Sequence, residues 1–169
     1  MNEYIITANG LDRIGIVSEI SKILTNNGGN IKESRMTKLA GDFVIIMLIE
    51  IESTKTEIEK FLSELNLIIS IKNATRVNQK SKNVITKKII LNGADNEGLV
   101  FSLTDFLSKN NINIKNLTTE IVQAPITGIN LFSMEALINI PHNISIEFLN
   151  EKIEFLKNNL EVDIELVEI

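Results

Sequence analysis

One stretch of the sequence occurs twice, first as Asn9-Gly10-Leu11-Asp12-Arg13-Ile14-Gly15-Ile16-Val17 and, 83 positions later, as Asn92-Gly93-Ala94-Asp95-Asn96-Glu97-Gly98-Leu99-Val100. The segment that follows each copy then reaches Asn-Ile, at residues 30–31 and 113–114, without a gap. Self-similarity at a fixed spacing indicates a duplicated structural unit. A unit of about 80 residues can bury its own small core, so we expect two copies of one domain, at residues 1–79 and 80–169.

The residues around the first copy predict alternating strands and helices. An apolar run at residues 4–8 ends at the Asn-Gly turn, as expected of a strand. Apolar side chains at Ile16, Ile20 and Leu24 then recur with helical spacing, and Asp12 is the expected N-cap of that helix. The glycines at residues 28–29 are expected to end it.

The order of elements predicts the fold class. In the first repeat we expect a hairpin at residues 30–49, a helix opened by a capping box at Thr54 and Glu57, and a strand at residues 67–77. The second repeat predicts strands at residues 84–92, 113–123, 130–140 and 162–167, with helices after residue 98 and at 144–159. The order βαββαβ, found twice, predicts an α+β fold of two tandem ferredoxin-like domains with antiparallel sheets.

One predicted strand, residues 43–49 (Phe-Val-Ile-Ile-Met-Leu-Ile), is apolar throughout. A sheet covered by helices on one face only should alternate apolar and polar residues. We therefore expect the other face of this strand to be covered as well, by the other repeat or by another chain. A homo-oligomer is the expected assembly.

Composition excludes several classes of site. The chain has no cysteine and one histidine, His142, so disulfides, thiolate sites and multi-histidine metal sites are excluded. We expect no cofactor and no metal. No titratable pair shares a motif with a plausible reacting partner, so we do not expect an enzyme. The longest apolar run is too short to span a membrane and the N-terminus lacks a signal-peptide layout, so we expect a cytoplasmic protein.

The charge distribution argues against direct nucleic-acid binding. The net charge is −5, and no separate reading helix is evident. Residues 67–90 nevertheless carry six basic and no acidic residues, at Lys72, Arg76, Lys80, Lys82, Lys87 and Lys88. A solvated linker between the repeats is the favoured interpretation, and a patch for nucleic acid or an acidic partner is the alternative.

The repeated loop is the candidate site. It lies where a helix is expected to begin, and free N–H groups there favour an anion such as a carboxylate. Asp12 could pair with an ammonium group, so the loop would suit a zwitterion. In the alternative interpretation Asp12 only caps the helix and the glycines only make a tight turn. Asn30 and Asn113, expected beside the loops, could bind a ligand or hold the loop in place.

The duplicated βαββαβ unit with Asp12-Arg13-Ile14-Gly15-Ile16-Val17 after its first strand resembles the ACT domain, a small regulatory module that binds amino acids. Over nearly the whole chain the sequence is similar to the tandem-ACT glycine cleavage system transcriptional repressor family. Three stretches carry this similarity: residues 11–17, Glu33-Ser34-Arg35-Met36-Thr37-Lys38-Leu39, and Ala124-Pro125-Ile126-Thr127-Gly128 leading to residues 131–135.

The resemblance implies a non-enzymatic regulator that senses glycine or a related amino acid and holds a separate DNA-binding activator without touching DNA. It implies a first ligand site lined by Asn9, Gly10, Leu11, Asp12, Arg13, Gly15 and Ile16, and a second lined by Asn92, Gly93, Asp95, Asn96, Gly98 and Leu99. Asn96-Glu97 replaces the usual basic residue and its neighbour, and Glu97 would repel a carboxylate. A purely structural dimerisation module is the competing hypothesis.

Overall fold

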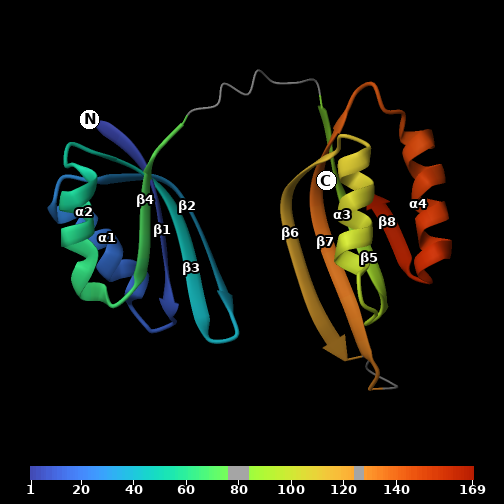
Figure 1. Cartoon of the computed structure of the whole chain (residues 1–169), viewed down its shortest axis with the longest axis horizontal. Helices are drawn as coiled ribbons and strands as arrows, with labels where there is room; N and C mark the ends of the chain where they lie inside the picture. Colours follow the sequence, from blue (N-terminus) through green and yellow to red (C-terminus); the bar gives the residue numbers. More distant parts are fainter. Residues whose placement is uncertain (76–83, 124–127) are drawn as a thin grey trace. The chain divides into compact units, whose positions relative to one another are not determined.

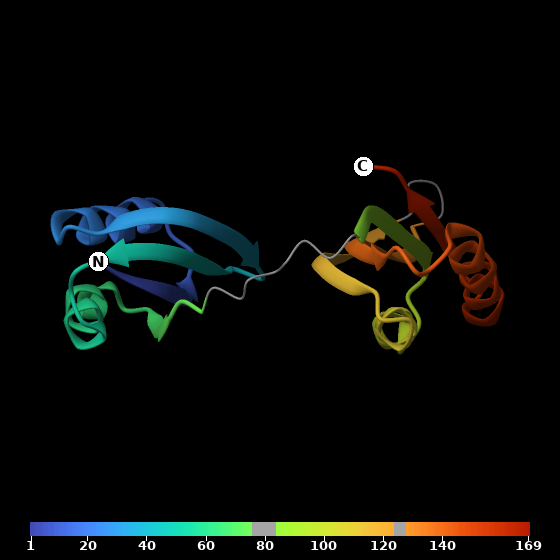
Figure 2. The ribbon, with the colours of Figure 1, turned by 90° about the horizontal axis from the view of Figure 1, so that it is seen from above.

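The computed structural model describes residues 1–75, 84–123 and 128–169. The chain divides into two compact units, Met1–Asn78 and Gln79–Ile169. In the first, α1 and α2 cover one face of a four-stranded antiparallel sheet, and α3 and α4 pack on the sheet of the second (Figures 1 and 2). The predicted α+β, tandem ferredoxin-like fold is confirmed. The predicted domain boundary lies outside the described residues.

The first unit has the strand order β2-β3-β1-β4. Its elements are β1 (Asn2–Leu11), α1 (Ile16–Asn26), β2 (Asn30–Leu39), β3 (Asp42–Ile51), α2 (Lys55–Leu62), a 3-10 turn η1 (Ser63–Leu65) and β4 (Ile68–Asn73).

The second unit repeats this topology, with the strand order β6-β7-β5-β8. Its elements are β5 (Val84–Ala94), α3 (Leu99–Lys109), β6 (Asn113–Gln123), β7 (Asn130–Pro141), α4 (Ile146–Leu160) and β8 (Asp163–Val167).

Both cores are formed between the sheet and its two helices. In the first unit Ala8 and Met47 are diagonal neighbours on the helix-covered face, and both are 1% exposed. Leu91 and Ala136 hold the same two positions in the second unit and are equally buried. A small and a large side chain have thus exchanged places, and such a swap keeps the core volume nearly constant.

The helix starts only partly follow the sequence prediction. The capping box is confirmed, because the Thr54 hydroxyl accepts from the Glu57 amide while the Thr54 amide donates to the Glu57 carboxylate at 2.7 Å. The predicted Asp12 N-cap is wrong. The N-cap of α1 is Gly15, whose φ of 91° lies in the left-handed region that glycine adopts without strain. Gly98 does the same for α3, with a φ of 84°.

The apolar strand β3 divides its side chains between the two faces of the sheet. Phe43, Ile45 and Met47 face the helices and are at most 2% exposed, whereas Val44 and Ile46 on the opposite face are 41% and 44% exposed. Coverage of that opposite face by another body therefore stays a prediction. No helix within the described residues is long and apolar enough to cross a membrane.

Candidate functional site

The β1–α1 loop lies against the tip of the β2–β3 hairpin. The Asp12 amide donates to the Gly41 carbonyl at 3.0 Å, and the Lys38 ammonium group is 2.7 Å from the Asp12 carboxylate. Leu11, the last residue of β1, pairs with Asp42 at the start of β3. The loop and the hairpin tip therefore form one surface at one end of the sheet.

The N-terminus of α1 at this surface is uncapped. The Ile16 amide donates to the Arg13 carbonyl at 3.3 Å, but among the described residues the amides of Val17 and Ser18 have no partner, and no side chain caps the helix. Free N–H groups and the helix dipole favour an anionic group at such an end. A small carboxylate group could accept hydrogen bonds from these free N–H groups.

Arg13 is engaged in an ion pair with Glu19. Its guanidinium donates to both oxygens of the Glu19 carboxylate, at 2.6 and 2.5 Å. Hydrogen bonding to Glu19 raises the pKa of Arg13, and the same bond from Arg13 lowers the pKa of Glu19. Glu19 lies in the first turn of α1, where a negative charge is also favoured by the dipole. Arg13 is thus free to meet a ligand only if Glu19 releases it.

Seven of the predicted site residues fall into three groups. Leu11 and Asn9 lie on the sheet face that the helices leave uncovered, and Leu11 is 78% exposed. Ile16 and Leu99 are 2% and 3% exposed in the two cores, so only their backbones could reach a ligand. Asp12, Arg13 and Gly15 surround the helix end.

Gly10 and Gly93 have a packing role. A Cβ at Gly10 would lie 2.8 Å from a methyl group of Leu67, and a Cβ at Gly93 would lie 2.5 Å from one of Val162. Each glycine lets the chain entering the last strand of its unit pass close to the first strand. The close approach explains both residues without a ligand.

The second loop lacks the charge balance of the first. In the first, Asp12 pairs with Lys38 and Arg13 pairs with Glu19. Within residues 84–123 and 128–169, Asp95 has no ion-pair partner. By register, Ile121 occupies the position of Lys38, and Glu97 adds a second negative charge. Residues 124–127, which carry part of the predicted family resemblance, lie outside the described residues.

The expected position of Asn30 and Asn113 beside the loops is wrong. Asn30 pairs with Glu50, which pairs with Glu3 near the start of β1. Glu3 and Leu11 are eight positions apart along the strand, a distance of about 26 Å. The physical reason is topology, because α1 returns the chain to the far end of the sheet before β2 begins. Asn113 occupies the matching position in the second unit.

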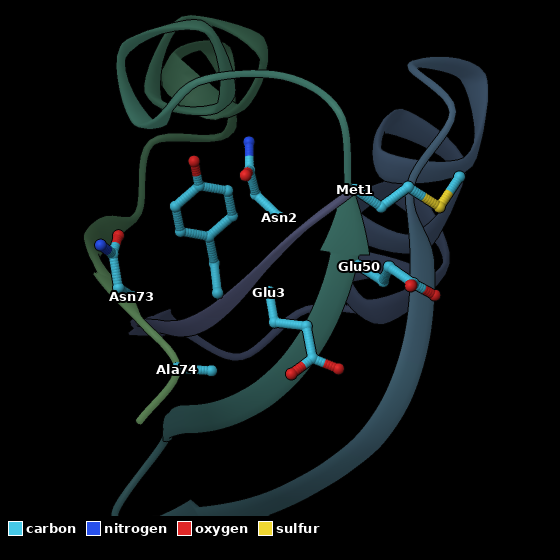
Figure 3. Close-up of a pocket in the computed structure, with 7 residues that line it drawn as sticks. Met1, Asn2, Glu3, Glu50, Asn73 and Ala74 are labelled. Carbon is cyan, nitrogen blue, oxygen red and sulfur yellow. The ribbon is translucent and has the colours of Figure 1, made fainter. Parts of the chain in front are cut away.

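The far end of the first sheet also holds a hollow of about 430 Å³. Figure 3 shows Glu3 and Glu50 beside it with Met1, Asn2, Asn73 and Ala74. It is remote from the β1–α1 loop. No group of three or more potential metal ligands exists among the described residues.

Two basic residues of the stretch are paired in the second unit, and Lys72 lies on the open sheet face of the first. Lys87 is 8% exposed and pairs with Glu168, and Lys88 pairs with Glu135 at 2.7 Å. Arg76, Lys80 and Lys82 lie outside the described residues.

Comparison with known proteins agrees with the geometry. Residues 3–72 match the model of the ACT domain. A UPF0237 protein of Methanococcus maripaludis is 36% identical over 69 residues, which span 41% of this chain and 72% of the relative. The chain belongs to the ACT-domain family. In this ACT protein the similarity extends over both units, because a crystal structure of an unknown protein from Galdieria sulphuraria is 30% identical over 99% of this chain and 98% of that one, with a TM-score of 0.86.

A third relative is the glycine cleavage system transcriptional repressor of Escherichia coli. It is 40% identical over 76 residues, which span 42% of this ACT protein and 40% of the repressor. Less than half of the repressor is therefore matched.

Proposed function

We propose that this ACT protein is a non-enzymatic, homo-oligomeric regulator that senses glycine or a related small amino acid. In this proposal the β1–α1 loop of the first unit is the stronger ligand site. The effector then changes a protein–protein contact with a DNA-binding transcription factor. The uncapped α1 N-terminus beside the Asp12–Lys38 pair is the observation that carries the proposal.

The two ends of a zwitterion match two features of this surface. The ligand carboxylate would accept hydrogen bonds from the free amides of Val17 and Ser18, where the helix dipole favours negative charge. The ligand ammonium group would pair with Asp12, whose side chain is 24% exposed. A small amino acid presents both charges within a few ångströms, so one molecule could satisfy both.

Ligand binding would then disturb the hairpin. The ammonium group competes with Lys38 for Asp12, and Lys38 comes from β2, near the exposed hairpin tip. Exchange of one cation for the other would release Lys38 toward the ligand carboxylate or toward solvent. This exchange offers a physical route from an occupied site to a changed outer surface.

Similarity to the glycine cleavage system transcriptional repressor supports a role in transcription regulation. The net charge of −5 and the pairing of Lys87 and Lys88 support action through a protein partner rather than through DNA. We expect no sequence-selective binding of duplex DNA by the protein alone. Fluorescence anisotropy showing selective binding at nanomolar protein and physiological salt would contradict that expectation.

A thermal-shift screen of the full chain against the twenty amino acids tests sensing directly. A ligand at 100 times its Kd stabilises the folded state by about 2.7 kcal/mol, which is readily seen as a raised Tm. We expect glycine or a close relative to give the largest shift, and Asp12→Ala to reduce it. If no amino acid raises the Tm even at millimolar concentration, the structural dimerisation module becomes the better hypothesis.

A further inference from the structure

The uncovered sheet faces of the two units differ in chemistry at matching positions. Because strand side chains alternate, register identifies the face away from the helices. On that face Leu48 matches Leu137 and Thr7 matches Ile90, but six other matching positions differ in size or polarity. In the first unit they hold Ile5, Leu11, Leu39, Val44, Ile46 and Ile68. In the second unit the same positions hold Lys88, Ala94, Val122, Ser133, Glu135 and Asp163.

The open face of the first unit exposes several large apolar side chains to water. Leu11 and Leu39 are each 78% exposed, Ile68 is 72% exposed, and Val44 and Ile46 exceed 40%. Soluble monomers rarely present a contiguous apolar patch of this kind, and larger patches mark interaction sites. The second unit, with an ion pair between Lys88 and Glu135 at its centre, shows that the fold does not require an apolar face here.

We infer that this face of the first unit packs against the same face of a second copy of the chain. The proposal specifies a surface for the proposed self-association and does not depend on ligand binding. A two-fold dimer of this kind uses one self-complementary patch on each partner.

Charge supports a second copy as the occupant. The open face of the first unit carries Glu3, Glu33, Asp42 and Glu50 against Arg35 and Lys72. Arg35 pairs with Glu33 at 3.5 Å, and Lys32 at the rim pairs with Glu50 at 2.5 Å, so repulsion between two like faces is weak. The open face of the second unit carries four acidic residues against Lys88: Glu120, Glu135, Asp163 and Glu165. Such an acidic face would leave the exposed apolar side chains of the first unit without apolar partners, whereas the same face of a second copy provides them.

The size of the face is also adequate. Four strands about nine residues long cover roughly 19 by 30 Å, or on the order of 600 Å² before side-chain relief is added. A stable interface buries about 800 Å² per partner. The two estimates are close enough for a specific dimer.

The first test measures mass by sedimentation velocity. We expect the wild type to sediment with twice the chain mass of 18.9 kDa at micromolar concentration. The decisive variant places the second unit's residues on the first unit, as Ile5→Lys, Val44→Ser and Ile46→Glu. We expect it to dimerise at least about 30-fold more weakly, the loss typical of removing a buried interface anchor. Phe155→Glu, at an exposed residue of α4, is the control and should leave the dimer intact.

The second test uses milder substitutions. The chain has no cysteine, so Ile46→Cys introduces a single thiol on the face, and Glu135→Cys introduces the matched thiol in the second unit. We expect the thiol at position 46 to react with Ellman's reagent about tenfold more slowly once the protein concentration has risen through the dimer Kd. The matched thiol at position 135 should show no such change. This measurement decides the matter if the triple variant does not fold.

Three results would overturn the proposal in distinguishable ways. A monomeric wild type at 100 µM with an accessible thiol at position 46 removes both self-association and the surface. A dimer that survives the triple variant, with an unprotected thiol, leaves self-association intact and removes this surface. A monomer whose thiol is protected at every concentration means that the second unit of the same chain covers the face.

Discussion

The two units share their helix-covered faces and differ on the opposite ones. On the covered face Ile6 and Ile89 hold the same position, and both are fully buried. On the open face Ile46 and Glu135 hold the same position, although one side chain is apolar and the other is charged. The fold therefore constrains the covered face, where the larger side chain of Leu91 in place of Ala8 is compensated by the smaller Ala136 in place of Met47. The other face is available for unit-specific interactions.

The loops repeat this division. Both helices begin at a left-handed glycine, so the backbone at the start of the helix is alike in both units. The charged side chains are not. Asp12 and Arg13 each have an ion-pair partner, whereas the second loop presents Asp95 and Glu97 without an opposite charge among the described residues. The shared part forms the fold, and the variable part sets what each loop can bind.

The largest effect that separates the units should come from the paired glycines. A Cβ at Gly93 would meet Val162 through its Cγ1, Cβ and Cα at 2.5, 3.0 and 3.4 Å, whereas at Gly10 it would first meet the mobile end of Leu67. Overpacking costs about 1–3 kcal/mol, so we expect Gly93→Ala near the upper end and Gly10→Ala near the lower.

Urea denaturation can assign each loss to its unit. Tyr4 is the only tyrosine and the chain has no tryptophan, so tyrosine emission follows the first unit alone, while far-UV circular dichroism follows both. Gly93→Ala should shift the dichroism curve and leave the emission midpoint in place. Equal losses in the two variants would mean that the close approach at Gly93 relaxes.

The next effect concerns ligand affinity. We expect Asp12→Ala to weaken amino-acid binding up to about tenfold by calorimetry, and Asp95→Ala to change it less than about twofold. The reason is that only the first loop combines a partner for an ammonium group with a neutral overall charge. Lys38→Met is the matched control, because it breaks the same ion pair but keeps Asp12. If Lys38→Met weakens binding as much as Asp12→Ala does, the ion pair shapes the loop and Asp12 does not hold the ligand.

A smaller difference is expected at the second helix of each unit. Thr54 makes a full capping box with Glu57, whereas the Ser145 hydroxyl only accepts from the Phe148 amide at 3.1 Å. Loss of a cap costs about 1 kcal/mol, so Thr54→Ala should destabilise the first unit by about 1 kcal/mol or slightly more. Ser145→Ala should destabilise the second unit somewhat less. Tyrosine emission and dichroism again separate the two, and a larger loss for Ser145→Ala would contradict the ranking.

Periodicity and turn residues were sufficient to predict the element order, but not the contacts of the loop. The apolar spacing of α1 and the capping box at Thr54 are local signals, and both appear in the structure. The sequence predicts Asp12 as an N-cap, but aspartate is common both at N-caps and in ion pairs. Only the backbone conformation at Gly15 shows that Asp12 is not the cap. Lys38 could not be placed beside Asp12 without the β2–β3 register. Asn30 was misplaced because the sequence did not indicate at which end of the sheet β2 begins.

The smallest effect tests whether Arg13 takes part in binding. Arg13 donates to the Glu19 carboxylate. In the second unit the position of Glu19 is held by Ser102, which offers no carboxylate. Glu19→Gln should free the guanidinium for the ligand carboxylate and tighten binding by about two- to fivefold, as expected of one exposed charge contact. Because salt screens exposed charges over about 8 Å at 0.15 M and 3 Å at 1 M, the gain should vanish at high salt. Ser102→Ala is the control and should change nothing. Unchanged calorimetric affinity for Glu19→Gln at low salt would mean that Arg13 only stabilises the start of α1, and that the backbone amides and Asp12 alone distinguish the two loops.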